Sequence, residues 1–165
     1  MAETVVVGID GSTDSAAALR WALDYAGQRG ANVRVVHVWT PVPWYDELSC
    51  DQRDELACDR ARSAEQGATR TGETLRALKA VPVGVAASVV EGAPGAALVE
   101  VSRAAALLVV GATSRGRADD GNPSQVGATA RYATRHAVCP VTWSATTGIR
   151  SRPCCASKKC RSPLR

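Results

Sequence analysis

Short apolar runs rich in valine alternate along this chain with segments of helical periodicity, and this alternation restricts the fold more than any other feature. The apolar runs predict strands over residues 5–10, 33–39, 81–90, 107–110 and 139–143. The segments between them predict helices over residues 13–30, 51–79, 94–105 and 124–136. Strands that alternate with helices imply a parallel sheet covered on both faces, with right-handed crossovers. We therefore expect an α/β fold, a single doubly wound domain with a five-stranded parallel sheet.

The helix over residues 13–30 has the clearest ends. Its apolar residues recur with the i, i+3, i+4, i+7 spacing of an amphipathic helix. Ser12 is a good N-cap for this helix, and Gly30 suits the left-handed conformation that often follows a helix. Pro94 is well placed in the first turn of the third helix. These residues predict where the two helices begin and where the first one ends.

A glycine-rich loop follows the fourth predicted strand. The strand breaks at Gly111, and residues 111–127 carry four glycines before a helical pattern resumes. Glycine allows the backbone to approach an anion, and a helix N-terminus offers free N–H groups. Ligands of such sheets bind at the carboxyl ends of strands, where the winding direction reverses. We expect the first and fourth strands to be neighbours there, which brings Asp10 and Gly111 together at a phosphate site.

Composition favours one folded domain and a basic extension. The chain has 165 residues, of which 45% are hydrophobic and 22% charged, and its formal net charge is +4. Residues 148–165 hold six basic side chains and no acid, which leaves 14 basic against 16 acidic residues in the remainder. The body is therefore a poor candidate for nucleic-acid binding. We expect a domain over residues 1–147 and a disordered basic tail over residues 148–165 that contains Cys154, Cys155 and Cys160.

Several function classes lack support in the sequence. No apolar run approaches the length of a membrane helix, and the N-terminus lacks the basic start of a signal peptide, so we expect a cytoplasmic protein. No nucleophile elbow, zinc-protease or kinase signature is present, so we expect no catalytic residues. The cysteines of the tail lack the paired spacing of a structural zinc site, and we expect no metal centre. His37 lies inside a predicted strand and is interpreted as structural.

Five segments in order resemble the universal stress protein family. They are VVVGIDGSTDSAAALRWALDYA, VRVVHVW, EGAPGAALVEVSR, LLVVG and RHAVCPV, and the resemblance spans residues 4–144. It implies an adenine nucleotide alpha hydrolase-like fold with the sheet order 3-2-1-4-5. It also implies a homodimer that pairs through the last strand, here Val138 to Trp143, and a stress-response regulator that acts through contacts with an unknown protein partner.

The resemblance also implies a binding site for ATP, with or without Mg²⁺. In that site Asp10 reaches the ribose, the backbone at Val38 meets the adenine, and the loop after the fourth strand wraps the phosphates. The residues that the resemblance assigns to the site are Gly8, Ile9, Asp10, Val38, Gly111, Arg115, Gly116, Gly127, Ala128 and Thr129.

The loop departs from the family's ATP-binding pattern. Four residues rather than two separate Gly111 from Gly116, and ten rather than nine separate Gly116 from Gly127. Ala128 stands at the usual hydroxyl position, with Thr129 one step later, and the pair Asp119 and Asp120 adds negative charge where a triphosphate would lie. Two alternatives therefore stay open. One is a dimeric interaction module that binds no nucleotide, and the other is a weak nucleotide hydrolase with one of these aspartates as base.

Overall fold

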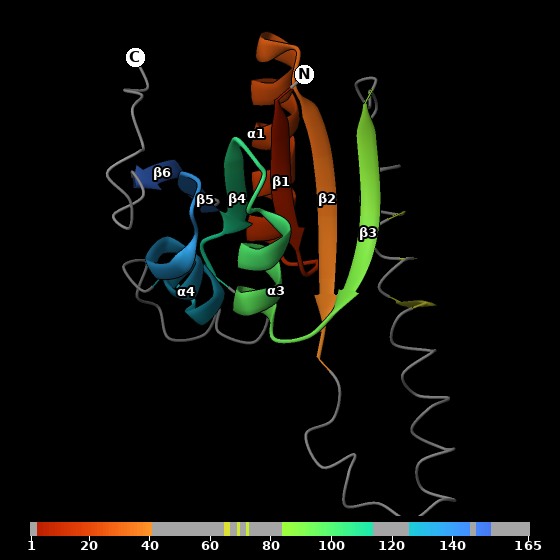
Figure 1. The fold of residues 1–165 in the computed structure, drawn as a ribbon, viewed down its shortest axis with the longest axis vertical. Coiled ribbons are helices and arrows are strands. Elements are labelled where there is room, and N and C mark those ends of the chain that lie inside the picture. Colours follow the sequence, from red (N-terminus) through yellow and green to blue (C-terminus); the bar gives the residue numbers. More distant parts are fainter. Residues whose placement is uncertain are drawn as a thin grey trace, which may run out of the picture.

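A twisted sheet forms the centre of the molecule (Figure 1). The computed structural model describes residues 3–40, 84–113, 126–145 and 148–152, together with four helical positions at residues 65, 66, 69 and 72. The strands are β1 (Thr4–Ile9), β2 (Asn32–Trp39), β3 (Val85–Glu91), β4 (Leu107–Gly111), β5 (Val141–Ala145) and β6 (Gly148–Arg152). The helices are α1 (Thr13–Arg29), α3 (Pro94–Val101) and α4 (Ala128–His136).

The sheet of these described strands has the order β3-β2-β1-β4-β5-β6. The first five are parallel, which confirms the doubly wound α/β fold and its order 3-2-1-4-5. β1 lies between β2 and β4, with Val5 opposite Leu107 and Val7 opposite Val109. The winding direction reverses between these two strands, so the carboxyl ends of β1 and β4 meet at one edge of the sheet, as the sequence predicts.

Helices cover both faces, with α1 on one and α3 and α4 on the other (Figure 1). Alternate residues of each strand point to opposite faces, so neighbouring valines of β1 enter different cores. Val5 and Val7 pack with Leu19 of α1, whereas Val6 packs with Leu98 of α3. This double covering explains why the strands read as continuous apolar runs in the sequence.

The ends of α1 confirm the predicted caps. The backbone N–H of Ser15 donates to Ser12 Oγ at 3.1 Å. Gly30 has φ +63°, in the left-handed region that favours glycine. Its N–H donates to the carbonyl of Ala26.

Other predicted boundaries need correction. α4 begins at Ala128 rather than residue 124, because Gly127 is extended, with φ −60° and ψ 160°. α3 ends at Val101 rather than residue 105, since the chain turns there to reach β4, and Ala106 N–H already donates to the carbonyl of Thr4. The fifth strand lies at residues 141–145 rather than 139–143. Most of the helix predicted over residues 51–79 lies outside the described residues.

The first part of the predicted tail is a strand. Residues 148–152 were expected to be disordered, but they form β6, which pairs antiparallel with β5. The expectation is wrong for these five residues because the outer edge of β5 offers them backbone hydrogen bonds that the sequence pattern does not reveal. The boundary at residue 147 and the homodimer through Val138 to Trp143 stay predictions, and residues 153–165 lie outside the described part of the chain.

Candidate functional site

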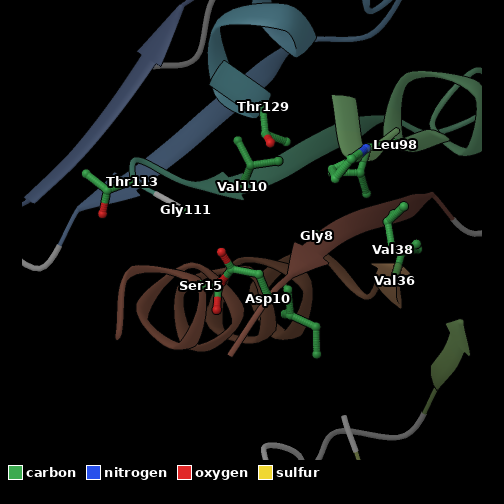
Figure 2. A pocket seen from close by; sticks show the side chains of 12 residues that line it. Gly8, Asp10, Ser15, Val36, Val38, Leu98, Val110, Gly111, Thr113 and Thr129 are labelled. Atoms are coloured by element: carbon green, nitrogen blue, oxygen red, sulfur yellow. The ribbon is translucent and has the colours of Figure 1, made fainter. Parts of the chain in front are cut away.

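A pocket opens at the carboxyl ends of β1, β2 and β4, where the sequence places the site (Figure 2). The strands, the start of α1 and the first turns of α3 and α4 all contribute to its wall. The lining residues are Gly8, Ile9, Asp10, Ser15, Val36, Val38, Pro94, Leu98, Val110, Gly111, Thr113 and Thr129.

One end of the pocket is apolar. Val36 and Val38 of β2 lie near Leu98 of α3 in Figure 2, with Val110 of β4 farther along the wall. Gly8 forms the floor under Leu98, and a Cβ built on Gly8 would lie 2.7 Å from Leu98 Cδ1. A side chain at this position would displace the end of the Leu98 side chain, so glycine allows Leu98 of α3 to pack closely over β1. The apolar surface formed by Val36, Val38, Leu98 and Val110 suits a flat, weakly polar group such as a nucleobase.

The other end of the pocket is polar. A carboxylate and three hydroxyl groups lie there (Figure 2). Asp10 and Thr113 contribute from just after β1 and β4, and Ser15 and Thr129 from the first turns of α1 and α4. Asp10 Oδ1 accepts a hydrogen bond from the backbone N–H of Ser12 at 2.9 Å. This contact is the ordinary turn that an aspartate makes before a helix. It orients the Asp10 carboxylate at the pocket wall.

The start of the glycine-rich loop is held by a residue of α1. Asp14 lies in the first turn of α1 and is only 6% exposed. Its Oδ2 accepts hydrogen bonds from Thr113 N–H at 3.1 Å and from Thr113 Oγ1 at 2.5 Å. Hydrogen bonds to a charged acceptor are stronger than neutral ones. Asp14 therefore positions Thr113, although the two residues are 99 apart in the chain.

The two ends of that loop are joined at its base. Gly127 N–H donates to the carbonyl of Ala112 at 2.7 Å. Gly111 lies against α1, and a Cβ there would come within 3.0 Å of the backbone nitrogen of Ser15. The sequence interpretation gave Gly111 the role of admitting an anion. The structure shows that its missing side chain admits the first turn of α1.

The N-terminus of α4 also faces this pocket through Thr129 (Figure 2). Its N-cap is Gly127, and no side chain of the described residues caps the helix. The first N–H groups of a helix have no partner within the helix, and together with the helix dipole they attract anions. The start of α4 therefore makes the polar end of the pocket favourable for an anion.

Six of the ten site residues implied by the resemblance line the pocket, namely Gly8, Ile9, Asp10, Val38, Gly111 and Thr129. Gly127 and Ala128 form the start of α4 next to Thr129 without lining it. Arg115 and Gly116 lie outside the described residues, as do Asp119 and Asp120. The roles of all ten residues in binding stay predictions.

Sequence reasoning missed other lining residues, among them Ser15, Leu98 and Thr113. Ser15 carried a signal, because it lies in the first turn of the helix that follows Asp10. Leu98 lies in the helix predicted over residues 94–105, and the sequence pattern of that helix did not indicate that it reaches the pocket. Thr113 lies between Gly111 and Gly116, where the loop is longer than the family's pattern, and no local pattern connects it to Asp14.

His37 is structural, as the sequence indicates. It is 8% exposed, and its Nδ1 donates to the carbonyl of Ile9 at 3.1 Å, which ties β2 to the end of β1 beside the pocket. The described residues contain no group of three or more histidine, cysteine, aspartate or glutamate side chains arranged to hold a metal ion. No helix among them is long and apolar enough to cross a membrane.

Comparison with known proteins identifies the family to which this chain belongs. A sequence model of the Universal stress protein family matches residues 1–143. The chain belongs to the universal stress protein family. Its fold is accordingly the adenine nucleotide alpha hydrolase-like fold of these domains, which confirms the resemblance.

Individual relatives agree with this assignment. Universal stress protein Rv2005c of Mycobacterium tuberculosis is 30% identical in an alignment of length 144 that covers 83% of this chain and 46% of that protein. This chain thus spans about half the length of the curated relatives it matches.

Two solved structures of universal stress proteins show the same fold. UspA from Lactobacillus plantarum has a TM-score of 0.61 at 20% identity, and the match covers 84% of this chain and 94% of that one. A universal stress protein solved in complex with cAMP has a TM-score of 0.51 at 25% identity, and the match covers 84% and 93% of the two chains.

Proposed function

We propose that this universal stress protein binds ATP or a related adenine nucleotide in the pocket at the carboxyl ends of β1, β2 and β4. In this proposal it is a cytoplasmic stress-response regulator, and the bound nucleotide alters its contacts with a protein partner. The observation that carries the proposal is the division of the pocket into an apolar end and a polar end. The polar end combines the Asp10 carboxylate, three hydroxyl groups and the N-terminus of α4.

Each end suits a different part of a nucleotide. Val36, Val38 and Leu98 offer an apolar slot for the base, and Asp10 offers a carboxylate oxygen to ribose hydroxyl groups. The α4 N-terminus offers N–H groups and a favourable dipole to phosphate oxygens. The relative with bound cAMP supports an adenine nucleotide as the ligand, since it shares both fold and family with this chain.

The proposal assigns no catalytic step. A hydrolase would need a general base beside the phosphates, and the described part of the pocket offers only Asp10, which we assign to the ribose. Nucleotide binding alone is sufficient for a regulator, because a ligand that binds one conformation more tightly shifts the population towards it.

Isothermal titration with ATP, in the presence and absence of Mg²⁺, tests the proposal. We expect saturable binding to one site per chain. Absence of heat at millimolar ATP, together with absence of adenine nucleotide in the denatured purified protein, would reject nucleotide binding. It would favour the alternative of an interaction module without a nucleotide ligand.

The role of Asp10 has its own test, in which ATP is compared with its 2′,3′-dideoxy analogue. The wild-type chain is expected to prefer ATP by at least about tenfold, because a hydrogen bond to a charged group contributes about 1.5–3 kcal/mol. Asp10→Ala should bind both nucleotides equally. Asp10→Asn separates loss of the charge from loss of the turn, since its amide oxygen can still accept the Ser12 N–H. It should also lose most of the preference for ATP. A preference that survives in both variants would remove Asp10 from the ribose site.

A further inference from the structure

The outer edge of β5 is occupied by a strand of the same chain. β5 pairs with β4 on one side and with β6 on the other, and the central pair of the outer ladder is Trp143 opposite Arg150. Ala145 lies opposite Gly148, so two residues connect the strands. Figure 1 shows β6 beyond β5 at the end of the sheet. An edge strand presents a row of unpaired backbone groups to any other strand, and β6 uses this row.

The register shows which backbone groups take part. Leu108 N–H and Ala112 N–H donate to the carbonyls of Pro140 and Ser144, so these positions of β5 face β4. Backbone groups alternate in direction along a strand. The positions between them, Val141, Trp143 and Ala145, therefore face β6. Their partners Arg152, Arg150 and Gly148 are the hydrogen-bonded positions of β6, whereas Ile149 and Ser151 face away from β5.

β6 runs in the direction that β5 of a second copy would take if a two-fold axis related the two copies. Two copies of a chain that share a two-fold axis across an edge strand pair that strand with itself in antiparallel fashion. β6 is the antiparallel strand in a sheet whose other strands are parallel. It thus runs beside β5 in the direction that the β5 of a second copy would take.

Both faces of β5 are covered, so its outer edge is the part of the strand that a partner strand can use. Its residues Thr142, Trp143 and Ser144 are 1%, 8% and 3% exposed, so both faces are already covered. β6 has one large apolar residue, Ile149, beside a glycine, a serine and two arginines. Val138, three residues before β5, is 53% exposed and leaves apolar area uncovered near the start of this strand in the chain. A second copy would therefore gain both the ladder and apolar contacts.

We propose that β6 occupies the place of a second copy's β5. The chain is monomeric while β6 is paired, and two copies join β5 to β5 in one continuous sheet when β6 leaves. The homodimer through residues 138–143 is then a state that β6 controls. This inference is independent of the nucleotide proposal, because the pocket lies at other strands.

Proline substitutions in the full-length chain test this proposal. Arg150→Pro removes an N–H that faces β5, whereas Ile149→Pro removes an N–H that faces away and is the matched control. Light scattering coupled to size exclusion, at micromolar concentration, should give a mass near 17.2 kDa for the wild type and for Ile149→Pro. It should give twice that mass for Arg150→Pro. A wild-type dimer that neither substitution changes, or a monomeric Arg150→Pro, would overturn the proposal.

Hydrogen exchange adds a readout that loss of structure cannot imitate. In Arg150→Pro the amides of residues 148–152 should lose protection, while those of Val141, Trp143 and Ala145 stay protected by the second copy. Loss of protection in both strands would contradict the proposal. If Arg150→Pro does not fold, Arg152→Pro at the far end of the ladder serves in both experiments with the same expected results.

Discussion

Asp14 joins parts of the pocket that are far apart in the chain. It lies in the first turn of α1, where a carboxylate is also favoured by the helix dipole, and it binds Thr113 through both the backbone and the hydroxyl group. Thr113 is the last residue described in the first part of the glycine-rich loop. Asp14 does not itself line the pocket. Its expected contribution is to position the loop against the phosphates rather than to touch the ligand.

Substitution of Asp14 should therefore weaken binding of the phosphate groups and leave binding of the nucleoside unchanged. We expect Asp14→Ala to weaken ATP binding by about tenfold, since it removes two charge-assisted hydrogen bonds that are not made to the ligand itself. Adenosine affinity should be unchanged, and Asp14→Asn, which keeps an acceptor oxygen, should cause a smaller loss. Calorimetric titration with both ligands gives the comparison. Equal losses for ATP and adenosine would show a general structural role instead.

At the scale of the element, α1 shows that the effect of a glycine on helix stability depends on its position in the helix. Gly27 lies inside the helix and Gly30 is its C-cap, with φ +63°. A Cβ built on either would meet nothing within 4 Å. Packing therefore cannot distinguish the two sites, and only the backbone conformation does.

The same substitution should have opposite effects at these two glycines. Gly27→Ala is expected to stabilise the protein by about 0.5–1 kcal/mol, because alanine loses less backbone entropy in a helix. Gly30→Ala should destabilise it by about 1–2 kcal/mol, because the left-handed conformation strains any residue with a Cβ. Urea unfolding of both variants provides the measurement, and each serves as the control for the other. Equal signs would contradict the assigned helix end.

At the scale of the whole molecule, the pocket draws its wall from six elements that meet at the switch between β1 and β4. A ligand there contacts the first strand, the fourth strand and helices on both faces of the sheet. Its binding is therefore coupled to folding of the whole domain, because the pocket does not exist in the unfolded chain.

Adenine nucleotide should raise the melting temperature of the domain. At a concentration one hundred times its Kd, a ligand adds about 2.7 kcal/mol to the free energy of unfolding. For a chain of this size that corresponds to roughly 5–10 °C. Thermal scans with ATP, GTP and inorganic triphosphate give the test. An equal shift with inorganic triphosphate would indicate that anions act on the basic residues 148–165 rather than in the pocket.

The full strand order was implied only by the family resemblance, whereas the sequence by itself predicted five parallel strands, the caps of α1 and a doubly wound sheet. It also predicted that Asp10 and Gly111 share one edge, because parallel strands joined by right-handed crossovers bring their carboxyl ends together. These properties follow from local periodicity and chain connectivity.

Only the tertiary structure decided the remaining contacts. The bonds between Asp14 and Thr113, the approach of Leu98 to Gly8, and the pairing of β6 with β5 join residues whose local patterns carry no sign of one another. Each depends on which surface or strand edge is left open once the sheet and helices have packed. Residues 148–152 illustrate this point, because their composition predicts a disordered tail and the edge of β5 makes them a strand.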